Sequence, residues 1–112
     1  MMRDRIESPE RLVVIVAVVA FSVMAAPARA ATIQIVMENL VIAPAEASAK
    51  VGDTIEWTNK DIVAHTATAD NGDFDVMLQP HKTGAFVLKK AGTVQYYCRF
   101  HPNMKATLKI DQ

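Results

Sequence analysis

The fold of this chain is decided near its C-terminus, by the stretch Val94-Gln95-Tyr96-Tyr97-Cys98-Arg99-Phe100-His101-Pro102-Asn103-Met104-Lys105-Ala106-Thr107-Leu108-Lys109-Ile110. Apolar residues alternate with polar ones on both sides of a central loop, residues 98–104. The alternating residues are Val94, Tyr96 and Cys98 before the loop, and Ala106, Leu108 and Ile110 after it. Because successive side chains of a strand point to opposite faces, each flank predicts a strand with one buried face.

The loop itself carries three potential metal ligands, spaced three residues apart: Cys98, His101 and Met104. A thiolate, an imidazole and a thioether together suit a soft metal ion, copper above all. Pro102 favours an extended conformation of His101. Each residue alone also has a simpler interpretation, since Cys98 could be a packing residue, His101 a solvated surface group and Met104 a cover of the core. The combination favours a metal site.

A fourth ligand has to come from elsewhere in the chain, and two histidines are available. His65 follows the apolar Ile62-Val63-Ala64 and starts a predicted strand, 65–69. His81 lies between Pro80 and Lys82 in what reads as an exposed turn. We favour His65, because a strand end holds a ligand more rigidly than the tip of a turn.

Residues 1–30 have the pattern of a secretory signal peptide. Leu12 to Ala26 is an apolar run of 15 residues, and Ala28-Arg29-Ala30 is a small-x-small cleavage motif. The alternative is an uncleaved membrane anchor, but a spanning helix needs roughly 20 apolar residues. We therefore expect cleavage after Ala30, export to the periplasm, and no stable association with the membrane afterwards.

The remaining residues, 31–112, suffice for one small domain. Eight Lys and Arg stand against nine Asp and Glu in this part, so no basic surface for nucleic acid is expected. The single cysteine of the chain, Cys98, cannot form an internal disulfide. It is therefore a buried small apolar residue, half of an intermolecular bridge or a working thiol, and in an oxidising compartment a free thiol is a hazard unless something occupies it.

Short predicted strands separated by turns every 8–12 residues favour an all-β fold, a Greek-key β-sandwich or barrel with antiparallel connections. Ranges 32–37, 54–58 and 65–69 are predicted strands, as is the segment around Phe86 and Leu88. The alanine-rich range 46–50 is the weakest strand candidate. Range 74–80 reads as irregular.

Three stretches together resemble the type 1 (blue) copper proteins, or cupredoxins, of the plastocyanin/azurin family, and most of all the amicyanin and pseudoazurin types. They are Val51-Gly52-Asp53-Thr54-Ile55-Glu56-Trp57-Thr58-Asn59, Ala64-His65-Thr66-Ala67 and Tyr97-Cys98-Arg99-Phe100-His101-Pro102-Asn103-Met104. The resemblance covers residues 32–111. It implies a plastocyanin-like domain that binds one type 1 copper ion, with His65, Cys98 and His101 as a trigonal set and Met104 as a weak axial ligand. Many relatives carry, where this chain has Thr66, an Asn that hydrogen-bonds toward the Cys loop; the Thr66 hydroxyl can still accept and donate hydrogen bonds.

The resemblance further implies a soluble, monomeric one-electron carrier that cycles between Cu(I) and Cu(II). Redox partner proteins would dock on a small apolar patch around His101, formed by Phe100 and Pro102 with Pro44 and Pro80 nearby. The alternative is a periplasmic copper-binding or copper-delivery protein without a redox task. An enzyme is not expected, because four filled ligand positions leave none open for a substrate.

Overall fold

The structure is a computed structural model that describes residues 15–17 and 29–112. Most of the predicted signal peptide, residues 1–30, lies outside this described part. The described chain forms nine strands: β1 (Thr32–Glu38), β2 (Val41–Ala43), β3 (Glu46–Lys50), β4 (Thr54–Asn59), β5 (His65–Ala69), β6 (Asp75–Leu78), β7 (Thr83–Val87), β8 (Gly92–Cys98) and β9 (His101–Asp111). Within the described ranges, no helix has the length and hydrophobicity needed to cross a membrane.

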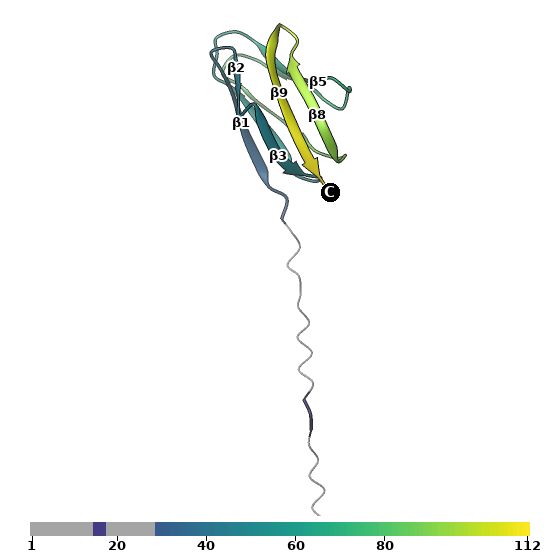
Figure 1. The fold of residues 1–112 in the computed structure, drawn as a ribbon. Helices are drawn as coiled ribbons and strands as arrows, with labels where there is room; N and C mark the ends of the chain where they lie inside the picture. The colour runs from purple at the N-terminus through teal and green to yellow at the C-terminus, as the bar shows by residue number, and fades with distance from the viewer. Residues whose placement is uncertain (1–14, 18–28) are drawn as a thin grey trace, which may run out of the picture.

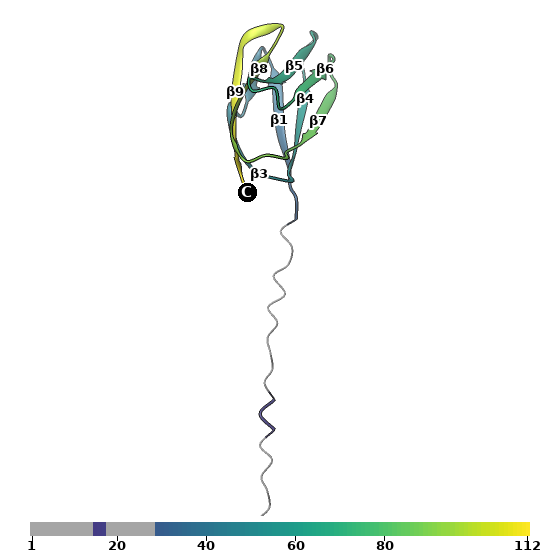
Figure 2. The ribbon, with the colours of Figure 1, turned by 90° about the vertical axis from the view of Figure 1, so that its right-hand side faces the viewer.

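The strands form two sheets that pack face to face (Figures 1 and 2). One sheet has the order β2-β1-β4-β7 and the other has the order β3-β9-β8-β5-β6. The predicted all-β sandwich is therefore confirmed. The core lies between the sheets and is filled by alternate residues of each strand, among them Ile35, Met37, Ile55, Trp57, Leu78, Tyr96 and Leu108.

Two strand pairs differ from the expectation of antiparallel connections. β1 pairs with β4 in parallel, with Ile33 opposite Ile55 and Ile35 opposite Trp57. β3 likewise pairs in parallel with β9. Parallel neighbours need a long crossover connection. For β1 and β4 this connection is residues 39–53, which first pair with β1 as β2 and then form β3 at the edge of the second sheet. Strand periodicity does not encode this path.

The prediction that residues 74–80 are irregular is wrong, because Asp75–Leu78 form β6. Val76, Met77 and Leu78 are three successive apolar residues, so the sequence shows no alternation there. The strand exists because it pairs with β5, placing Leu78 opposite His65. The weak candidate at 46–50 does form β3, where Ala47 and Ala49 are buried.

The two ends of the sandwich differ. The turn after β3 contacts both ends of the domain. The Asp53 carboxylate accepts hydrogen bonds from the Ala31 and Lys50 amides, each at 2.8 Å. The Val51 amide donates to the Asp111 carbonyl in the same region. These backbone donors lower the pKa of Asp53, that from Ala31 most strongly. The β8–β9 hairpin, with Cys98 and His101, lies at the opposite end (Figure 1).

Candidate metal centre

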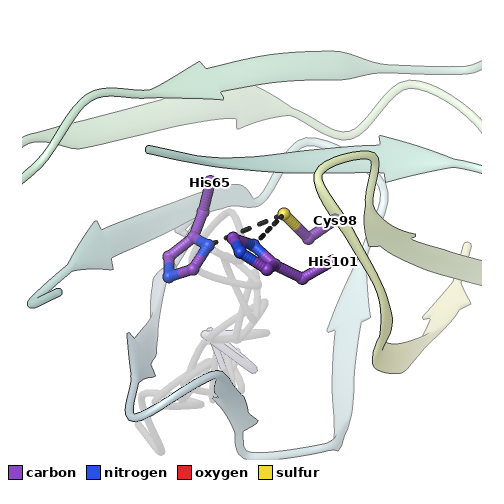
Figure 3. Close-up of side chains that lie close together, drawn as sticks. All are labelled: His65, Cys98 and His101. Atoms are coloured by element: carbon purple, nitrogen blue, oxygen red, sulfur yellow. Dashed lines mark hydrogen bonds between the residues drawn. The ribbon is translucent and has the colours of Figure 1, made fainter. Parts of the chain in front are cut away.

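Three of the predicted ligands converge at the hairpin end of the sandwich: His65, Cys98 and His101 (Figure 3). The Cys98 Sγ lies 3.6 Å from Nδ1 of His65 and 3.7 Å from Nδ1 of His101. One ligand atom from each residue lies within 4.8 Å of the others. His81 is not part of this cluster; it is exposed, in the turn between β6 and β7, with a φ of 61°.

Cys98 is the last residue of β8 and is fully buried, with its side chain on the inner face as the alternation predicts. The strand register shifts between Tyr97 and Cys98, so that Cys98 lies opposite His101. The Thr66 amide lies 3.4 Å from Sγ and donates to it. A thiolate at this position therefore has a backbone donor as well as two neighbouring imidazoles.

His65 is the first residue of β5 and is also fully buried. Its Nε2 lies 2.7 Å from Oδ2 of Asp61. Because a carboxylate only accepts, this contact places the proton of neutral His65 on Nε2 and leaves the Nδ1 lone pair directed toward Cys98. The hydrogen bond with His65 is the main cause that lowers the pKa of Asp61, and the Asn39 and Leu40 amides contribute further.

His101 is half-buried and begins β9. Its ring stands edge-on to that of His65, with 5.1 Å between the ring centroids. Only Arg99 and Phe100 separate the two strands, so the connecting loop is shorter than the predicted range 98–104. β9 begins at His101, which pairs with Cys98, and the next pair is Tyr97 with Lys105, so residues 102–104 form an irregularity in the ladder. His101 is held by its pairing with Cys98 across the turn.

Met104 lies three residues after His101, on the buried face of β9, and is 3 % exposed. It shares this face with Ala106, Leu108 and Ile110, as the alternation predicts. Its burial at the hairpin end suits both interpretations that the sequence leaves open, the cover of the core and the weak ligand.

Sequence reasoning missed two polar residues that position His65. Asn59 is fully buried; its Nδ2 donates to the Val63 carbonyl at 2.8 Å and its Oδ1 accepts from the Asp61 amide at 2.9 Å. Asp61 in turn holds His65. The sequence Asn59-Lys60-Asp61 reads only as a turn, but an acidic residue four positions before a candidate ligand is a usable signal.

The donor set fits a copper ion. A trigonal centre with metal–ligand bonds of roughly 2.0–2.3 Å places neighbouring donor atoms about 3.5–4 Å apart. The two separations from Sγ, 3.6 and 3.7 Å, fall within this range. A thiolate with two imidazoles is the donor combination of type 1 copper sites. The buried setting also excludes water from the sulfur.

Comparisons with known proteins agree with this geometry. Residues 11–110 match the cupredoxin-like domain family. No curated protein sequence matches the chain. A solved structure of a purple cupredoxin from Nitrosopumilus maritimus is similar, with 26 % identity, 70 % of this chain and 99 % of that chain covered, and a TM-score of 0.63. A reduced amicyanin mutant is similar at 24 % identity, with 71 % and 82 % of the two chains covered and a TM-score of 0.62. The chain therefore belongs to the cupredoxin-like family, as a blue copper protein with a site for one type 1 copper ion.

Proposed function

We propose that this protein is a soluble periplasmic carrier of single electrons, with His65, Cys98 and His101 as the three strong copper ligands and Met104 as a weak fourth. The convergence of one buried thiol and two imidazole nitrogens supports this assignment most directly. The similar amicyanin structures include reduced, oxidised and Cu(I) forms. Copper held by such a set supplies a one-electron Cu(I)/Cu(II) couple.

The protein contributes rigidity to electron transfer. Asp61 fixes the ring of His65 and the strands β8 and β9 fix Cys98 and His101, so these ligands keep their positions when an electron arrives or leaves. The Thr66 amide, by donating to Sγ, stabilises negative charge on the sulfur. A pre-organised set of this kind favours fast exchange of electrons over any reaction that needs an open position.

A partner protein would approach at the exposed side of His101. Phe100, next to it in the turn, is 49 % exposed, and Pro102 is exposed as well. Leu40, whose amide donates to Oδ2 of Asp61, and Ile62, the residue after Asp61, are also exposed. Small apolar surfaces of this kind suit brief, low-area encounters with redox partners. We propose this surface as the docking site of the monomeric carrier.

Export is part of the proposal. Cleavage after Ala30 would release residues 31–112 into the periplasm, and the first described strand begins at Thr32, directly after the proposed cleavage site. Intact mass of the protein from a periplasmic fraction tests this step. A first residue other than Ala31, or retention of residues 12–26, would contradict it.

The function is tested by adding Cu(II) to residues 31–112 and recording the visible spectrum. We expect an intense sulfur-to-copper charge-transfer band that disappears in Cys98→Ser, because a hard hydroxyl replaces the thiolate. His65→Ala should also lose the band, whereas His81→Ala, the matched control at the exposed histidine, should keep it. Slow electron self-exchange together with fast transfer of copper to an apo-acceptor would instead support copper delivery.

A further inference from the structure

A closed circuit of hydrogen bonds runs beside the cysteine of the proposed copper site. The Arg99 amide donates to Oγ1 of Thr66 at 2.9 Å, and this hydroxyl lies 2.8 Å from Oγ1 of Thr68. The Thr68 hydroxyl donates to Oδ1 of Asp75 at 2.8 Å. Nε of Arg99 donates to the same Oδ1 at 3.2 Å, which closes the circuit.

The direction of every bond in this circuit is determined by its two ends. An amide N–H only donates, so the Thr66 oxygen accepts from Arg99; because the single proton of Thr68 goes to Asp75, the bond between the two hydroxyls must use the proton of Thr66. A carboxylate only accepts, so Thr68 must give its proton to Asp75. The hydrogen bond from Thr68, and to a lesser extent that from Arg99, lower the pKa of Asp75, so the carboxylate is ionised at neutral pH. Each hydroxyl then has one available orientation.

The circuit touches both neighbours of the sulfur. Thr66 is fully buried and its amide donates to Sγ of Cys98 at 3.4 Å, while Arg99 is the residue that follows Cys98. Asp75 lies on β6, opposite Thr68 of β5, and its side chain is 54 % exposed. The exposed carboxylate of Asp75 is thus connected, through two hydroxyls, to the Arg99 amide that follows Cys98 and to Thr66, whose amide donates to the cysteine sulfur.

We propose that Asp75 is a positioning residue for the copper hairpin: through Thr68 and Thr66 it holds the Arg99 amide and, with it, the turn that carries Cys98 and His101. This inference rests on the proposed function only for its effect on copper. The hydrogen-bond circuit itself exists without a metal ion, so it can be tested in the metal-free protein.

The first test measures hydrogen exchange of the Arg99 amide by NMR in metal-free protein. We expect Asp75→Ala and Thr68→Val each to raise the exchange rate about tenfold, the effect of losing one hydrogen bond of ordinary strength. Asp75→Asn, whose amide oxygen can still accept from Thr68, should largely restore protection. Asp73→Asn removes a half-buried carboxylate two residues before Asp75 and outside the circuit, and it serves as the control for charge.

The second test measures the reduction potential of the copper-loaded variants. Thr68→Val removes the partner of the Thr66 hydroxyl, so the hydrogen bond from the Thr66 amide to Sγ should weaken. A more electron-rich thiolate stabilises Cu(II), so the reduction potential should fall. Simple loss of a negative charge acts in the opposite direction, because it destabilises the more positive Cu(II) state. Unchanged Arg99 exchange in both Asp75→Ala and Thr68→Val would overturn the proposal. So would an effect of Asp75→Ala without any effect of Thr68→Val, since the carboxylate would then act through its charge or its direct bond with the Arg99 side chain and not through the two hydroxyls. Failure to bind copper with altered exchange would refute the proposed function but not the circuit.

Discussion

Replacing Asn59 by alanine should destabilise the domain far more than the same change at another asparagine with similar contacts. The Asn59 amide group lies within hydrogen-bond distance of the carbonyls of Val63, Leu78 and Gln79, at 2.8, 3.1 and 3.3 Å. Its Oδ1 accepts from the Asp61 amide at 2.9 Å. The side chain therefore joins the end of β4 to the loop before His65 and to the end of β6.

The size of the effect follows from the number of bonds lost. Two amide hydrogens and one accepted bond make three hydrogen bonds of about 1 kcal/mol each, so the free energy of unfolding should fall by about 3 kcal/mol. Carbonyls left without a partner in a buried site make this a lower bound. For a domain of this size, 3 kcal/mol corresponds to a decrease in Tm of about 12–24 °C. The total stability expected for such a domain is roughly 4–12 kcal/mol.

Asn71 provides the matched control. Its Oδ1 also accepts from the amide two residues later, Asp73, at 2.9 Å, and its Nδ2 also donates, but the site is exposed. Water replaces these bonds, so Asn71→Ala should change the stability by less than about 0.5 kcal/mol. Urea unfolding of metal-free wild type and both variants decides the matter. Equal effects of the two substitutions would refute the reasoning that lost hydrogen bonds are costly at the buried site and are replaced by water at the exposed one.

Three further predictions concern other parts of the sandwich. Gly84→Ala would place its Cβ 2.7 Å from Cγ1 of Val76 and 2.8 Å from Cδ2 of Leu78, so it should lower stability by about 1–3 kcal/mol in thermal unfolding; Val76→Ala should recover part of the loss, and no recovery would place the clash elsewhere. Burial raises the pKa of Tyr96 to about 12 despite the hydrogen bond from Trp57. The protonated phenol therefore stabilises the fold at pH values below the unfolded-state pKa near 10, and this contribution is lost as the pH rises through 12; ionisation of Tyr96 near pH 10 in the folded protein, followed by ultraviolet absorbance, would contradict this. Met104→Leu should keep the copper and its colour but raise the potential, because a weak donor to Cu(II) is lost; voltammetry that shows an unchanged potential would assign Met104 to packing alone.

The convergence of His101 on Cys98 could be predicted because the relevant information is local. Cys98 and His101 are brought together by a spacing of three residues across a tight hairpin, and the side-chain alternation of β8 directs the thiol inward. His65 required a choice between two histidines. The structure places its Nδ1 3.6 Å from the Cys98 Sγ, whereas His81 is exposed and lies outside the cluster.

The supporting contacts could not be predicted, because they depend on how distant segments pair. Asp75 meets Thr68 only since β6 pairs with β5, and β6 itself has no periodic signal. Asn59 is buried because the loop before His65 and the end of β6 cover it. The parallel pairs β1–β4 and β3–β9 are likewise products of the chain path between the sheets rather than of any strand's own sequence.

The arrangement of the two ends of the sandwich has a practical consequence for attaching this protein to a surface. Ala31 is held by Asp53 and Asp111 by Val51, so both ends of the domain leave from the turn opposite the β8–β9 hairpin (Figure 1). A linker fused at either end would leave the half-buried edge of His101 facing away from the support. Immobilised on an electrode through a long flexible tether, the protein could still turn its redox end inward; through a short rigid one, it would present that end to proteins in solution.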